Sequence, residues 1–113
     1  MSCSHYLHTY WNSVATLLVI LSEYGEVNES SLKEDYQKVI KENEIYPIEN
    51  FETAFHYLKD VEKVIEVKEG KGERIIKLLK EGKELFERIL PKIKHAKDDI
   101  VSSIFNKIYD IFE

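Results

Sequence analysis

Two short β-branched segments joined by a glycine-containing loop constrain the fold of this chain more than any other feature. The segments are KVIEVK at 63–68 and RIIKLL at 74–79, and EGKGE lies between them. β-branched residues favour strands, and glycine permits the turn that joins two strands. The sequence therefore predicts one β-hairpin in a chain whose other segments follow helical patterns.

The loop of this hairpin does not have the pattern of a nucleotide site. A phosphate-binding P-loop has a longer spacing, ends in Lys followed by Ser or Thr, and is followed by a helix. Here a strand-like segment follows Gly70-Lys71-Gly72. We therefore interpret these three residues as the tip of the hairpin.

The segment 6–24 predicts a first helix. Its apolar residues recur at helical spacing, and Gly25 follows as a C-terminal stop. Leu17, Val19 and Ile20 widen the apolar face until it nearly encircles the helix. Because one small domain seldom covers such a helix, we expect part of it to meet a second subunit.

A second helix is predicted at about 31–43. It follows a short extended segment, EVN at 26–28, and Ser31 with Glu34 has the spacing of a capping box. Apolar residues on one face of this helix leave its charged residues in water.

The remaining helices lie on either side of the hairpin. Pro47 disfavours helix at the preceding residue, so a third helix is expected to begin at Glu49 or Asn50. It runs to about Val61, and its predicted inward residues are Phe51, Ala54, Phe55, Leu58 and Val61. A last helix begins near Glu81 and either kinks or restarts at Pro91.

The resulting fold class is mainly α with a small β-hairpin, in the order α-α-α-β-β-α with a long C-terminal helix. This is the element order of a winged helix-turn-helix. A chain of 113 residues supports one domain. We expect residues 26–80 to form the core, and residues 1–25 and 81–113 to supply helices for dimerisation.

Part of the chain, roughly 27–90, resembles winged-helix regulators of the MarR and PadR type. IKLLKEGKEL is similar to the family's second wing strand and the opening of the next helix, with Leu78, Gly82 and Leu85 in register. YLKDVEKVIEV resembles the end of the recognition helix and the first wing strand. The chain departs from the family at Leu79, where a capping Thr is common, and at Lys63, where a turn Gly is common.

The resemblance implies double-stranded DNA as the partner, with a recognition helix in the major groove and a wing along the backbone or minor groove. The residues that would contact DNA are Asn50, Thr53, His56, Tyr57, Lys59, Lys63, Lys68, Lys71 and Arg74. Glu52 and Asp60 share the face of the recognition helix, where they could accept from cytosine or be repelled by phosphate.

We also expect a homodimer, because the apolar faces of the first and last helices exceed what one such unit covers. The expected interface residues are Tyr10, Trp11, Leu18, Ile93, Ile100, Ile104 and Ile108.

The charge pattern both limits and supports the DNA hypothesis. The net charge of −5 opposes binding to phosphate. The charges are unevenly placed, however: residues 26–66 hold 11 acidic and 5 basic side chains, whereas residues 67–97 hold 10 basic and 5 acidic ones. The basic half begins at the hairpin.

Other classes of site receive little support. Cys3, His5 and His8 are possible metal ligands without an obvious fourth, and as the only cysteine Cys3 forms no internal disulfide. No nucleophile, base and orienting group can be assembled, so we expect no enzyme, no cofactor and no metal. The longest apolar run is too short for a membrane span and the N-terminus lacks a signal-peptide pattern, so a cytoplasmic protein is expected.

Two other functions stay open from the sequence. The first is a winged-helix protein–protein interaction module whose acidic face binds a basic partner. The second is a regulator that senses an effector in a pocket at the dimer interface near Tyr10 and Trp11.

Overall fold

The computed structural model describes residues 2–45 and 48–95 and places in them four α-helices, one π-helical turn and a small antiparallel sheet. The protein is mainly helical in this part. The elements in chain order are α1 (Ser2–Tyr24), β1 (Glu26–Asn28), α2 (Glu29–Asn43), α3 (Phe51–His56), η1 (Tyr57–Val61), β2 (Ile65–Glu69), β3 (Arg74–Leu78) and α4 (Lys80–His95).

The sheet has three strands, in the order β1-β3-β2. The predicted order α-α-α-β-β-α omitted β1, which pairs antiparallel with β3 so that Val27 lies opposite Ile76. On the other side of β3, Val67 lies opposite the same Ile76. A three-residue strand carries little periodicity of its own, and the backbone of β3 provides its partner.

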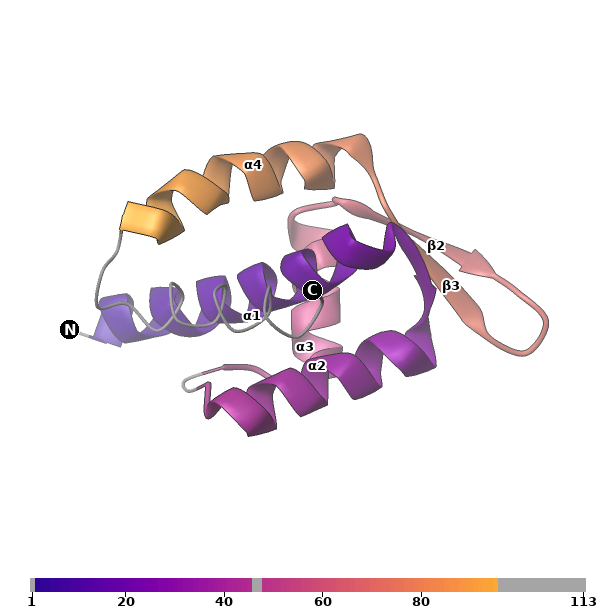
Figure 1. The fold of residues 1–113 in the computed structure, drawn as a ribbon, viewed down its shortest axis with the longest axis horizontal. Helices are drawn as coiled ribbons and strands as arrows, with labels where there is room; N and C mark the ends of the chain where they lie inside the picture. The colour runs from indigo at the N-terminus through magenta and orange to yellow at the C-terminus, as the bar shows by residue number, and fades with distance from the viewer. Residues whose placement is uncertain (1, 46–47, 96–113) are drawn as a thin grey trace.

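Helix α1 forms the centre of the core. It lies between α4 and α2 in Figure 1, and α3 also packs against it. Every residue from 12 to 21 is buried within the chain. The expectation that this part of the helix needs a second subunit is therefore wrong, because the other elements of the same chain already cover it.

The start of α2 differs from the predicted capping box. The helix begins two residues earlier than expected, and the Asn28 side chain accepts a 2.9 Å hydrogen bond from the backbone N–H of Ser31. Ser31 therefore lies inside the first turn. Asn at the N-cap satisfies a helix donor as well as Ser does, and the pairing of β1 fixes Asn28 at that position.

The third helix begins and ends where the sequence predicts, but its last turn is π-helical. Glu62 N–H donates to the carbonyl of Tyr57, five residues earlier. Four of the five predicted inward residues are buried, whereas Val61 is 54% exposed. A π turn holds more residues than an α turn, so Val61 leaves the inward stripe that a regular helix would give it.

Helix α4 is continuous through Pro91, so the helix does not restart there. It begins at Lys80, and the buried Gly82 lies in its first turn. A side chain at Gly82 would lie 2.7 Å from the carbonyl oxygen of Val64 and would also meet Leu78. Glycine thus allows α4 to cross close to the segment that leads into β2.

Candidate nucleic-acid interface

Asn50 is placed by the structure at the start of α3, with a structural role there. Its side chain accepts a 2.9 Å hydrogen bond from the backbone N–H of Thr53. Asn50 was predicted to contact DNA, and in the structure its side-chain oxygen caps the helix. This capping interaction positions the first turn of α3.

The outer face of α3 and η1 contains most of the other predicted residues. Thr53 and Tyr57 are half-buried. The exposed side chains of this face are Glu52, His56, Lys59 and Asp60. Lys63, two residues after the end of η1, is exposed as well. The structure thus brings the predicted residues of the helix onto one accessible surface.

The acidic residues of this surface have cationic or potentially cationic neighbours. Lys33 Nζ lies 2.9 Å from Glu52 Oε1, and this hydrogen bond is the main reason why the pKa of Glu52 is lowered. His56 Nδ1 lies 2.9 Å from Asp60 Oδ2, one helical turn away. No ion pair among the described side chains involves Lys59 or Lys63.

The C-terminal end of η1 is tied to α1. Tyr10 donates a 2.6 Å hydrogen bond from its hydroxyl to Glu62 Oε1, and its ring centroid lies 4.7 Å from that of Tyr57. Burial, followed by the bond to Glu62, raises the pKa of Tyr10. The ring of Trp11 packs edge-on against Tyr10 and is 37% exposed.

The residues predicted to form the dimer interface differ in their exposure. Tyr10 is half-buried by these contacts, and Trp11 remains accessible. Leu18 is fully buried in the core of its own chain, so it offers no surface to a partner and its assignment to the interface is wrong. Of the other predicted interface residues, the side chain of Ile93 and the whole of Ile100, Ile104 and Ile108 lie outside the described part of the chain.

The hairpin, comprising β2, β3 and the loop 70–73, projects away from the helices in Figure 1. Gly70 N–H donates to the carbonyl of Glu73 at 2.7 Å, and Gly72 has a φ of 81°, which favours glycine. Lys68 and Lys71 are exposed on this projection. The prediction of a turn at Gly70-Lys71-Gly72 is confirmed.

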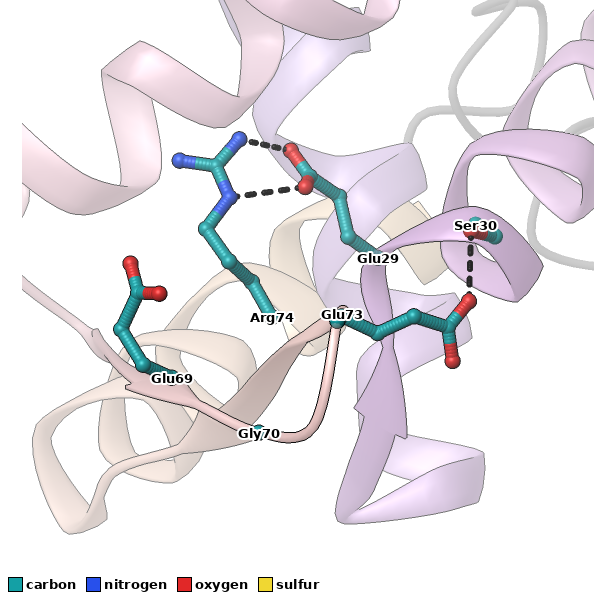
Figure 2. Close-up of a pocket in the computed structure, with 7 residues that line it drawn as sticks. Glu29, Ser30, Glu69, Gly70, Glu73 and Arg74 are labelled. Atoms are coloured by element: carbon teal, nitrogen blue, oxygen red, sulfur yellow. Dashed lines mark hydrogen bonds and ion pairs between the residues drawn. The ribbon is translucent and has the colours of Figure 1, made fainter.

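Arg74 does not point freely from the hairpin. Its Nε donates to Glu29 Oε2 at 2.8 Å, and its Nη2 donates to Glu29 Oε1 (Figure 2). These bonds raise the pKa of Arg74. Ser30 Oγ also donates to Glu73 at 2.9 Å. A small polar cavity of about 320 Å³ lies at this junction, lined by Glu29, Ser30, Glu69, Gly70, Gly72, Glu73 and Arg74.

Lys77, on the outward face of the sheet, has acidic neighbours on both sides. Its cross-strand partners are Glu26 in β1 and Glu66 in β2, and all three side chains are exposed. Opposite charges at directly facing positions attract one another. This face of the sheet therefore does not extend the positive surface of the hairpin tip.

Sequence reasoning missed Glu29 as the partner of Arg74. The two residues are 45 positions apart in the sequence, and neither belongs to a sequence motif that would indicate the other as its partner. Glu29 is recognisable only as an acidic residue in the first turn of a helix, where it also interacts favourably with the helix dipole.

The described part of the chain contains no group of three or more His, Cys, Asp or Glu placed to hold a metal ion. The side chains of Cys3, His5 and His8, which the sequence offers as possible metal ligands, lie outside the described part. None of the helices within residues 2–45 and 48–95 combines the length and apolarity that a membrane crossing needs.

Comparison with known proteins finds no matching family model, no matching curated protein and no matching solved structure.

Proposed function

We propose that this protein is a winged-helix DNA-binding protein that acts as a homodimeric transcriptional regulator. In this proposal α3 with η1 is the recognition helix and the β2–β3 hairpin is the wing. The observation that carries it is the projection of the hairpin away from the helical body, with exposed Lys68 and Lys71 near its tip. Such a basic projection suits contact with phosphates beside a helix in the major groove.

The local pairing of charges supports the same function in spite of the negative net charge. Glu52 is matched by Lys33, and Asp60 by His56 if the imidazole is protonated. Among the described ion pairs none involves Lys59, Lys63, Lys68 or Lys71. These four lysines are the side chains that we assign to phosphate contact. Because they are few, we expect modest affinity that falls steeply with salt.

The dimer is a separate part of the proposal. An accessible Trp11 beside Tyr10 supports a contact between subunits at this end of α1, because exposed aromatic residues are enriched in interfaces. Two recognition helices would then address half-sites about one turn of DNA, roughly 34 Å, apart. Sedimentation at micromolar concentration tests this part, and a monomer would contradict it.

One observation favours the interaction module as a second candidate. The N-terminal residues of a recognition helix normally approach base edges, and here this position holds the exposed carboxylate of Glu52. A basic protein partner would suit that surface. In this case DNA would not bind even at low salt.

Selection of bound genomic fragments at several salt concentrations tests the DNA proposal. Wild type is compared with Lys71→Ala, and with Lys38→Ala as a matched control on the exposed face of α2. We expect Lys71→Ala to weaken binding on all sequences and to reduce the slope of log affinity against log salt by about 1. The control should bind like wild type. Failure of the wild type to retain DNA at low salt contradicts the proposal.

A further inference from the structure

Arg74 connects the hairpin to both neighbouring helices. Its guanidinium donates two hydrogen bonds to the carboxylate of Glu29, the first residue of α2. The guanidinium carbon also lies 5.7 Å from the ring centroid of Phe55, a buried residue of α3. One side chain of the hairpin thus contacts α2 and α3 together.

The contact between Arg74 and Glu29 begins where the backbone pairing of β1 with β3 ends. The last paired residues of β1 and β3 are Asn28 and Ile75. Glu29, the first residue after β1, and Arg74, the first residue of β3, come next, and their side chains continue the contact by one position. One residue further along each segment, Ser30 Oγ donates to Glu73. Beyond this point the loop 70–73 is exposed.

The charge around Arg74 argues against a primary role in phosphate binding. Glu29 engages two of its nitrogens, and Glu69 is its cross-strand partner in β2. The local set of one guanidinium and two carboxylates is net negative. A phosphate that approached the guanidinium would be repelled by the carboxylates of Glu29 and Glu69, which Figure 2 shows beside Arg74.

We propose that Arg74 is a positioning residue that anchors the wing to α2 and α3 through Glu29 and Phe55. The anchor fixes the place of Lys71 relative to α3 and so governs DNA binding indirectly. The anchoring itself is independent of any ligand, whereas its effect on DNA rests on the proposed function.

Hydrogen exchange of the hairpin amides without DNA tests the anchor directly. Arg74→Ala and Glu29→Gln should each accelerate exchange in residues 68–75 by about threefold or more. Arg74→Lys keeps the charge but loses the two-pronged geometry, so it should resemble Arg74→Ala. The reversed pair Glu29→Arg/Arg74→Glu should restore part of the protection. Thermal unfolding verifies that each variant folds, and exchange unchanged in both single variants overturns the proposal.

DNA binding then separates anchoring from phosphate contact. For an anchor, Arg74→Ala and Glu29→Gln both weaken binding and leave the salt slope unchanged. For a phosphate contact, Arg74→Ala lowers the slope by about 1 and Glu29→Gln tightens binding, and this result contradicts the anchor. Accelerated exchange together with no DNA binding by the wild type would leave the anchor established and refute only the DNA function.

Discussion

Tyr10 in α1 donates a 2.6 Å hydrogen bond from its hydroxyl to Glu62, the residue that immediately follows η1. The two residues are 52 positions apart. The bond holds the end of the proposed recognition helix against the central helix of the core. The packing of the Tyr10 ring on Tyr57 strengthens the same attachment.

Replacing Tyr10 by Phe keeps the ring packing and removes this hydrogen bond. We expect the free energy of unfolding to fall by about 1 kcal/mol, because Glu62 loses a donor in a partly buried site. Tyr24→Phe is the matched control, since its hydroxyl binds Asp35 at an exposed site and should contribute less. Urea unfolding measures both variants, and equal effects would contradict the importance assigned to the Tyr10–Glu62 bond.

Stability should fall in alkali because of Tyr36. Burial raises the pKa of its phenol, whose hydroxyl donates to the carbonyl of Glu49. The folded state therefore favours the protonated form, and this contribution is complete below pH 10 and is lost as the pH rises above it. We expect about 1.4 kcal/mol per pH unit from this residue. Urea unfolding across this range should show a shallower fall for Tyr36→Phe than for wild type.

Gly82→Ala should destabilise the protein although alanine is the better helix former. The helix propensity gain is about 1 kcal/mol, whereas forcing a methyl group against a backbone carbonyl and a packed Leu costs about 1–3 kcal/mol. We expect a net loss of about 1 kcal/mol in chemical unfolding. Glu81→Ala, on the exposed neighbouring position, is the control and should change stability by less than about 0.5 kcal/mol. A stabilised Gly82→Ala variant would contradict the close packing.

Substitutions at Lys63 and Glu44 distinguish the effect of backbone strain on stability from the effect of the Lys63 side chain on DNA binding. Both have left-handed backbones, with φ of 57° and 51°, which glycine adopts more readily. Lys63→Gly and Glu44→Gly should each raise the free energy of unfolding by about 0.5 kcal/mol, since relief of strain exceeds the added entropy of the unfolded chain.

DNA affinity should distinguish the two substitutions. Lys63→Gly should weaken binding, because Lys63 is exposed at the end of the proposed recognition helix. Glu44→Gly, at the end of α2, should leave affinity unchanged. Thermal unfolding and titration of fluorescent DNA measure the two effects. If affinity is unchanged in both variants, Lys63 has no role in contact.

Local patterns in the sequence predicted the elements well where neighbouring residues decide the outcome. Apolar residues at helical spacing marked the helices, the glycines at 70 and 72 marked the turn, and the start of α3 was expected at Glu49 or Asn50, of which Asn50 is the N-cap. Each of these depends on interactions within a few residues, which the sequence displays directly.

Only the tertiary structure decided how those elements meet. The pairing of β1 with β3, the burial of Leu18 within its own chain and the bond from Arg74 to Glu29 each join distant segments. The exposure of Val61 accompanies a π turn that the regular helical spacing of the sequence did not indicate. A local pattern records which residues favour burial or charge, but the partner that each residue finds is selected by the packing of the whole chain.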